Sequence, residues 1–194
     1  MTAMRWRRPG RIVRRMTLLP AAALLLLAAL LGACADEDNV TVQQYDCSKF
    51  AAVDGAICGG GVVVASDYQG QGIVLVLQPM DAGLFTWGPA VSDPNAADNI
   101  DGRNNTSTFA PDHPAGFYCY TLVLNGRDDW YLPTNQENSA IYAAYTAGLL
   151  PGLQAAQYWQ SRQNSATAAW TLNYGAGTQQ SVTKSVPVLV RCMR

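Results

Sequence analysis

Apolar positions form one unbroken run near the N-terminus and then recur in short runs separated by polar turns. The unbroken run covers residues 18–31, which is shorter than the roughly 20 residues that cross a bilayer. No acidic residue precedes it, but six arginines do: Arg5, Arg7, Arg8, Arg11, Arg14 and Arg15. A basic start followed by a short apolar stretch is typical of an export signal. We therefore predict a signal peptide over residues 1–33.

The end of this segment, Leu31-Gly32-Ala33-Cys34, resembles the lipobox that lipoprotein signal peptidase recognises. The resemblance implies cleavage before Cys34 and diacylation of its thiol, which would anchor the mature chain to a membrane of the cell envelope. Residues 34–46 are polar and acidic, and we expect them to form a tether. Ala35, where an aspartate is absent, is compatible with the outer membrane, and whether the domain faces the periplasm or the outside stays open. An uncleaved anchor helix is the alternative, and it would leave the domain in the same compartment.

The short runs after residue 46 predict strands in the first and last parts of a domain. Residues 62–65 and 73–77 are rich in β-branched side chains and flank a glycine-bearing turn, which is typical of a β-hairpin. Apolar and polar residues alternate over 170–174, which predicts a strand with one buried face. Further strands are expected at 129–133, 179–184 and 186–192.

Two helices are expected between these strands. One covers about 114–124 and ends before Gly126. The other begins after Thr134, because Thr134 and Glu137 have the spacing of a capping box, in which each side chain accepts a free backbone N–H. Residues 81–113 are rich in glycine, asparagine, aspartate and proline and are expected to form a long loop. The order of elements predicts an α+β domain over residues 47–194, with the helices packed on a mostly antiparallel sheet.

The charge of the chain depends on its signal peptide. The full chain has 13 Lys and Arg against 14 Asp and Glu, a net charge of −1. Removal of the six signal arginines leaves 7 − 14 = −7. An acidic domain repels nucleic acids, so we expect no nucleic-acid partner.

Four cysteines remain in the mature chain: Cys47, Cys58, Cys119 and Cys192. An even number in an oxidising compartment predicts two disulfides, although the count alone leaves the pairing open. The sequence has no Cys-x-x-Cys, and its single histidine, His113, gives neither a metal-ligand set nor a catalytic triad. We therefore expect no metal and no cofactor.

Several separated motifs occur in the order found in one bacterial family. Asp129-Trp130-Tyr131-Leu132-Pro133-Thr134, Tyr158-Trp159, Ala169-Trp170 and the closing Val190-Arg191-Cys192-Met193-Arg194 closely resemble the Lcl C-terminal domain family, named from a collagen-like bacterial adhesin. The likeness extends upstream, where one subgroup of the family resembles Gly59-Gly60-Gly61-Val62-Val63, Gly70-Gln71-Gly72, Trp87-Gly88 and Asn105-Thr106. It therefore covers about 59–194, nearly the whole mature domain.

The resemblance implies a fold similar to C-type lectins and to the formylglycine-generating enzyme. In such folds a disulfide often ties the first helix to the last strand, which implies Cys119–Cys192 and leaves Cys47–Cys58. The enzyme relatives need a reactive cysteine pair, whereas all four cysteines have structural places in this chain. The chain is therefore not expected to be an enzyme.

Two departures from the family bear on the ligand. The family's Tyr-Trp-Ser-Ser-Thr is Tyr158-Trp159-Gln160-Ser161-Arg162 here, and the sulfated glycans associated with the adhesin do not suit an acidic domain. Trp130, Trp159 and Trp170 are expected in the core, because buried tryptophans commonly anchor a small core. A loop face formed by residues 81–113 and 160–168 is expected to bind a glycan or an envelope protein. Its candidate contacts are Trp87, Arg103, Asn105, Gln160 and Arg162.

Other interpretations of the chain carry less weight. A structural or assembly lipoprotein without a small ligand is the main alternative, and an enzyme related to the formylglycine-generating enzyme is the last. Asp98, Asp101, Asn104 and Asn105 lack the spacing of a calcium loop and are interpreted as a turn.

Overall fold

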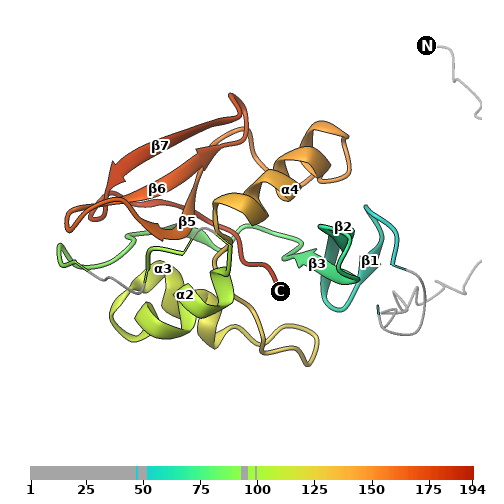
Figure 1. Cartoon of the computed structure of the whole chain (residues 1–194), viewed down its shortest axis with the longest axis horizontal. Coiled ribbons are helices and arrows are strands. Elements are labelled where there is room, and N and C mark those ends of the chain that lie inside the picture. Colours follow the sequence, from blue (N-terminus) through green and yellow to red (C-terminus); the bar gives the residue numbers. More distant parts are fainter. Residues whose placement is uncertain (1–46, 48–51, 93–95, 99) are drawn as a thin grey trace, which may run out of the picture. The chain divides into compact units, whose positions relative to one another are not determined.

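The structure is a computed structural model and describes Cys47 and residues 52–92, 96–98 and 100–194 (Figure 1). All of these residues belong to one unit of the chain, Gln44–Arg194. The predicted signal peptide (1–33), the predicted lipidation site Cys34 and the predicted tether (34–46) lie outside the described residues. Within the described part, none of the helices combines the length and the apolar character that crossing a membrane requires.

The first sheet contains the predicted hairpin. Its strands are antiparallel and lie side by side in the order β1 (Ile57–Cys58), β2 (Gly61–Tyr68) and β3 (Ile73–Leu77). Gly70 and Gly72 have positive φ in the turn between β2 and β3, and the Asp67 carboxylate accepts a hydrogen bond from the Gly72 N–H at 2.6 Å. The hairpin predicted from the two β-branched runs is therefore confirmed.

The second sheet has five strands in the order β4-β8-β5-β6-β7. In chain order they are β4 (Gly83–Phe85), β5 (Gln157–Gln163), β6 (Ala168–Asn173), β7 (Thr178–Thr183) and β8 (Val188–Val190). β5 and β8 run parallel, and the other described pairs run antiparallel. The mostly antiparallel character predicted from the sequence is confirmed.

The strand predicted at 129–133 is wrong. Tyr131 forms only an isolated bridge with Met193. The next position of such a ladder is Pro133, which has no N–H to donate and whose oxygen accepts the Ser161 N–H at 2.9 Å instead. Met193 also bridges Leu77 at the end of β3, so the C-terminal residues tie the first sheet to the rest of the domain.

The described helices are α2 (Gly102–Phe109), the 3₁₀ helix η2 (Ala110–Asp112), α3 (Pro114–Thr121) and α4 (Asn135–Thr146). α3 and α4 are the two predicted helices, although α3 ends earlier than expected. The capping box is present: the Glu137 N–H donates to Thr134 Oγ1 at 3.4 Å, and Glu137 Oε2 accepts from the Thr134 N–H at 2.7 Å. Gly148 follows α4 with a positive φ, as helix C-termini favour.

α2 lies in the segment predicted to be a loop, and this prediction is wrong. Its sequence, Gly-Arg-Asn-Asn-Thr-Ser-Thr-Phe, consists mostly of weak helix formers, so no local signal indicates a helix. The Asp101 carboxylate accepts the Asn104 N–H at 2.8 Å, and the helix buries Asn105, Thr106 and Phe109 against α3 and β5. Tertiary packing supplies the stability that helix propensity lacks.

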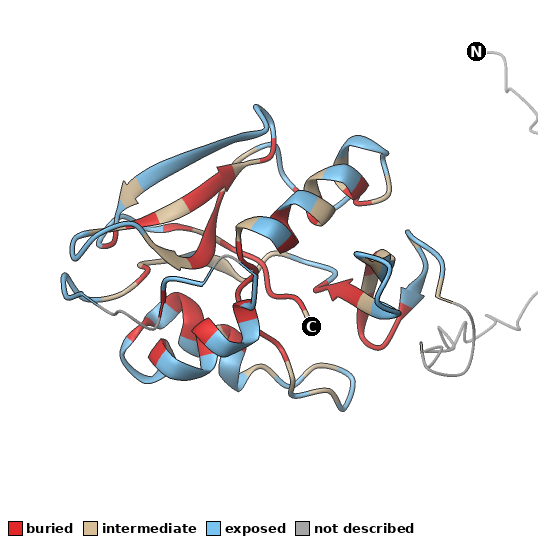
Figure 2. Ribbon diagram, viewed as in Figure 1, coloured by how far each residue is buried: buried red, intermediate tan, exposed pale blue. Residues whose placement is uncertain are grey.

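Buried side chains form two clusters. The buried residues are the red parts of the ribbon in Figure 2. One surrounds Trp87, Trp130 and Trp159 and joins α2 and α3 to the second sheet. The other surrounds Ile141 and Tyr158 and joins α4 to both sheets. The prediction of a core position is confirmed for Trp130 and Trp159, whereas Trp170 is only half-buried.

Both disulfides implied by the family resemblance are present. Cys119 in α3 bonds to Cys192 just after β8, and Cys47 bonds to Cys58 at the end of β1. The first pair is fully buried and fastens α3 to the second sheet. The α+β fold and its disulfide staples are therefore confirmed, with one more α-helix than the sequence predicted.

Candidate functional site

Three of the five predicted ligand contacts are buried: Trp87, Asn105 and Gln160 each expose 0 % of their surface. The Trp87 indole N–H donates to the backbone oxygen of Gln160 at 2.8 Å, and its ring lies 4.9 Å from that of Phe109. Asn105 Nδ2 donates to Ser161 Oγ at 3.2 Å. The predicted surface position is therefore wrong for all three, because α2 and the segment around Trp87 fold over β5. None of them is accessible to a ligand in this structure.

The other two predicted contacts, Arg103 and Arg162, reach solvent in different surroundings. The Arg103 side chain is 56 % exposed. Arg162 is half-buried, with its guanidinium carbon 5.7 Å from the centre of the Trp170 ring. Arg162 lines neither of the two hollows that Arg103 lines. Arg103 is thus the predicted residue around which a candidate site forms.

Two hollows meet at Arg103 and Tyr131, which line both of them. One has a volume of about 380 Å³ and lies beside the β2–β3 hairpin. The other has a volume of about 290 Å³ and lies between α2, α3 and the segment 128–131. We call them together the Arg103 groove. Its polar and aromatic lining includes Tyr68, Asp101, Glu137 and Arg194 in the first hollow and Ser107, Tyr120, Asp128 and Asp129 in the second.

Asp129 is the electrostatic centre of the groove. Its Oδ2 lies 3.4 Å from Arg103 Nη2 and 3.5 Å from Arg194 Nη1. The same guanidinium groups lie over aromatic rings. The guanidinium carbon of Arg103 is 5.3 Å from the centre of the Tyr131 ring, and that of Arg194 is 5.8 Å from the centre of the Trp130 ring. These contacts hold both arginines in place and leave the groove without an excess of positive charge.

Two buried polar atoms of the groove make no hydrogen bond in the structure. They are Asp129 Oδ1, the second oxygen of the paired carboxylate, and the hydroxyl oxygen of Tyr68. A buried polar atom without a partner is uncommon, and each such atom calls for an explanation. Both belong to residues that line the Arg103 groove, one in each hollow.

Glu137 links the groove to the capping box of α4. The Tyr131 hydroxyl donates to Glu137 Oε1 at 2.9 Å, while Oε2 caps the helix. Burial raises the pKa of Glu137 above its ordinary value, and the hydrogen bonds from Thr134 and Tyr131 oppose that rise. Burial, followed by the nearby Glu137 carboxyl, raises the pKa of Tyr131, so this hydroxyl stays a donor at neutral pH.

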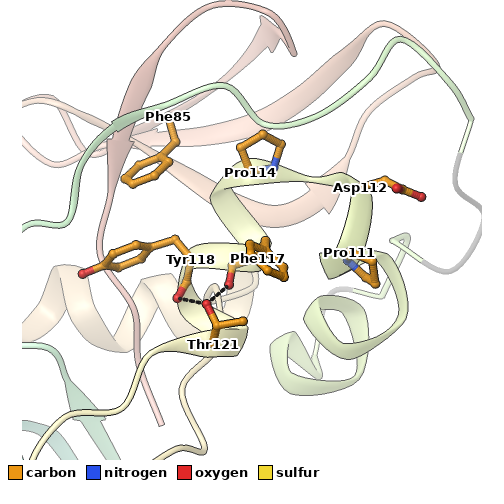
Figure 3. Close-up of a pocket in the computed structure, with 7 residues that line it drawn as sticks. All are labelled: Phe85, Pro111, Asp112, Pro114, Phe117, Tyr118 and Thr121. Carbon is orange, nitrogen blue, oxygen red and sulfur yellow. Dashed lines mark hydrogen bonds between the residues drawn. The ribbon is translucent and has the colours of Figure 1, made fainter.

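A second recess, of about 410 Å³, is lined by other residues of α3 than the Arg103 groove is (Figure 3). Phe85, Phe117 and Tyr118 supply aromatic surface, and the Phe85 and Tyr118 rings lie 5.1 Å apart. Thr121 turns its hydroxyl back to the carbonyl oxygens of Phe117 and Tyr118, as the dashed lines in Figure 3 mark. Asp112 is the charged residue of the lining, together with Pro111 and Pro114. We call this recess the α3 pocket, and its chemistry is mainly apolar.

The exposed aromatic residues of α3 were not among the predicted contacts, although the sequence holds a signal for them. Phe117 is 49 % exposed and lines the α3 pocket, whereas Tyr120 is 51 % exposed and lines the Arg103 groove. They are three residues apart in a predicted helix, so they share its outer side, while Ala115 and Cys119 are buried. Helical spacing relative to the buried cysteine would have identified them.

The remaining candidate residues make contacts that stabilise the fold. Asp98 and Asp101 accept backbone N–H groups at the start of α2, in agreement with a turn. His113 packs edge-on against Trp87 at 4.7 Å, and its Nδ1 lies 2.6 Å from the Phe109 carbonyl oxygen. Among the described residues, no three His, Cys, Asp or Glu side chains are grouped so that they could hold a metal ion.

Comparisons with known proteins identify a family for most of the domain. The model of the Lcl C-terminal domain matches residues 82–194. No match was found among curated proteins. A crystal structure of a fimbrial protein from Bacteroides ovatus is similar with a TM-score of 0.45 and 13 % identity, over 71 % of this chain and 38 % of that one. This chain therefore spans well under half of the fimbrial protein, and at that TM-score the likeness supports no further conclusion.

Proposed function

The chain belongs to the Lcl C-terminal domain family, and from that premise we propose that it is a non-catalytic recognition module of the bacterial cell envelope that binds a glycan in the Arg103 groove. The family is named from a bacterial adhesin, which supports an adhesin-like role. The predicted signal peptide and the predicted diacylated Cys34 support a lipid-anchored position, with the outer membrane favoured by Ala35.

The observation that carries this proposal is the pairing of an exposed aromatic ring with unfilled hydrogen-bonding capacity. Tyr120 offers half of its surface at one wall of the groove, where the apolar face of a sugar ring can stack. Asp129 Oδ1 and the Tyr68 hydroxyl make no hydrogen bond in the structure. Sugar hydroxyls donate and accept hydrogen bonds and therefore suit both atoms, and the exposed Arg103 guanidinium has further N–H groups that can donate to them.

The charges of the groove favour a neutral glycan. The guanidinium groups of Arg103 and Arg194 already pair with Asp129, and Asp101 and Asp128 add negative charge nearby. A sulfated polysaccharide needs clustered cations that exceed the neighbouring acids. The mature charge of −7 opposes it further.

A glycan array probed with the mature chain, carrying Cys34→Ser to avoid acylation, tests the proposal. Tyr120→Ala and Arg103→Ala should each weaken binding by about tenfold, the ratio that corresponds to roughly 1.4 kcal/mol of lost contact. Phe117→Ala is the matched control, because Phe117 lies on the same helix with nearly the same exposure but lines the α3 pocket. No glycan binding by a folded chain, or binding that ignores both groove variants, would contradict the proposal.

A second candidate function, docking of an envelope protein, is favoured by the α3 pocket. Its rings and prolines with a single carboxylate suit an apolar side chain of a protein better than a polyhydroxylated sugar. Crosslinking in intact cells separates the two functions. A dominant protein adduct that Phe117→Ala abolishes and Tyr120→Ala retains supports docking, and the reverse pattern excludes it.

The non-catalytic character and the anchor are parts of the same proposal. All four cysteines of the described residues are in disulfides, so none of them offers the free thiol that the chemistry of the formylglycine-generating enzyme needs. Mass spectrometry of the chain purified from its own host should detect a diacylated Cys34 at the N-terminus. An unprocessed N-terminus would refute the anchor without affecting the groove.

A further inference from the structure

β7 is an outer strand of the second sheet, and its free edge is unusually open. It pairs with β6 in an unbroken antiparallel register, from Ala168↔Thr183 to Asn173↔Thr178. Among the described strands, none pairs with its other edge. All residues of β7 except Val182 are exposed, and Figure 2 shows the strand pale blue along most of its length.

The register determines which backbone groups face away from β6. The Lys184 N–H donates to the Thr167 oxygen at 2.9 Å, so these two residues form a hydrogen-bonded pair of the ladder. Hydrogen-bonded pairs alternate along an antiparallel ladder, so the backbone N–H and C=O groups of residues 178, 180 and 182 bond to β6. The backbone groups of Gln179, Ser181 and Thr183 therefore point outward, although the Thr183 oxygen also accepts the Val186 N–H.

β7 lacks the devices that usually protect an edge strand. Proteins blunt such edges with charged side chains, proline, bulges or very short strands. β7 spans six residues, Thr-Gln-Gln-Ser-Val-Thr, with no charge and no proline, and its pairing shows no register shift. The opposite edge of the same sheet, β4, has three residues and is protected by its shortness.

We propose that the free edge of β7 pairs with β7 of a second copy of this chain, antiparallel about a two-fold axis at Ser181. In this register Ser181 lies opposite Ser181, and Gln179 lies opposite Thr183 of the other copy. Amide and hydroxyl side chains both donate and accept, so each of these residues is complementary to its counterpart. An apolar partner would find no matching surface on this polar strand.

Charge also favours a second copy at this edge. Two mature chains of −7 repel each other, but β7 carries no charge and Lys184 beside it is buried. Pairing through β7 therefore brings two uncharged edges into contact and places no like charges of the two copies opposite each other. A single strand pair buries little surface, so the association should be weak and reversible.

Sedimentation velocity of the mature chain carrying Cys34→Ser, from micromolar to millimolar concentration, tests the proposal. The wild-type strand should give a reversible monomer–dimer equilibrium. Ser181→Lys places like charges opposite each other and should abolish the dimer, while Ser181→Ala should retain it. Ser139→Lys on α4 makes the same charge change at another exposed site and should leave the dimer intact.

A cysteine crosslink tests the register itself. Opposite residues of a hydrogen-bonded pair have Cα atoms about 5.5 Å apart, within the range that a disulfide spans. Ser181→Cys should therefore give a crosslinked dimer on mild oxidation. Thr178→Cys, equally exposed on the same strand, would lie roughly 20 Å from its copy and should not. A chain that stays monomeric at every concentration, a dimer that survives Ser181→Lys, or equal crosslinking by both cysteines would overturn the proposal.

Discussion

The two disulfides should differ in the stability they contribute, because they close loops of very different length. Cys119 and Cys192 are 73 residues apart, whereas Cys47 and Cys58 are 11 apart. Chain entropy predicts that removal costs about 4.4 kcal/mol for the long loop and about 2.8 kcal/mol for the short one. The expected difference is therefore about 1.6 kcal/mol.

Packing increases this difference. Cys119 and Cys192 are both fully buried in the cluster around Trp87, whereas Cys47 is only partly buried. Replacing the first pair by alanine therefore also leaves a cavity in the core, which adds to the free-energy cost. Cys58 is buried in the same cluster, so only the larger cavity left by the first pair adds to the difference that loop length predicts.

Urea unfolding of the mature chain carrying Cys34→Ser measures these costs. The two variants to compare are Cys119→Ala with Cys192→Ala, and Cys47→Ala with Cys58→Ala. Both should show a larger m-value than the parent, because the unfolded chain loses a crosslink and exposes more surface. If only the variant without Cys119–Cys192 lost its cooperative unfolding transition, that result would agree with the larger free-energy cost predicted for this disulfide. Equal costs, or a larger cost for the short loop, would refute the chain-entropy reasoning.

Three further predictions concern single side chains. Thr134→Ala removes the acceptor of the Glu137 N–H and should cost about 1 kcal/mol in urea unfolding, whereas no loss would mean that the cap contributes nothing. Burial raises the pKa of Glu137 in the folded protein. The stability that this carboxyl contributes is therefore complete below its unfolded pKa and is lost as pH rises through its folded pKa. In Glu137→Gln this loss of stability, measured as Tm against pH, should disappear. Arg191→Ala leaves the partly buried Asp81, 3.0 Å from Arg191 Nη1, without its cation and should cost roughly 3–5 kcal/mol, whereas Arg103→Ala at the surface should cost roughly 0–1 kcal/mol. Comparable losses for the two arginines in urea unfolding would contradict this.

Local signals in the sequence predicted much of the secondary structure. The capping box at Thr134, the β-branched runs around Gly70 and Gly72 and the position of α3 involve residues close together in the chain, and the structure has all three. Such patterns act through neighbouring backbone groups, so they keep their meaning whatever packs on them. The even cysteine count predicted disulfides, but only the family resemblance selected Cys119–Cys192.

The candidate site could be predicted only in part. Arg103 was identified from the sequence, and the structure places it at the meeting point of two hollows. Tyr120, Asp129 and Arg194 come to the same groove from α3, from the segment before Tyr131 and from the C-terminus. No pattern along the chain announces that these segments meet.

From the sequence alone come the prediction of an export signal, with an acidic chain after its removal, and the start of α4 and the α+β order of elements that the structure confirms. Only the tertiary structure decided which side chains are exposed. Trp87 and Gln160 are 73 residues apart, yet the indole of one bonds to the backbone of the other and both are withdrawn from solvent. α2 exists for the same reason, since weak helix formers adopt a helix when Phe109 and Asn105 are buried against distant elements. Burial depends on contacts between remote segments, and composition and periodicity report only on neighbouring residues.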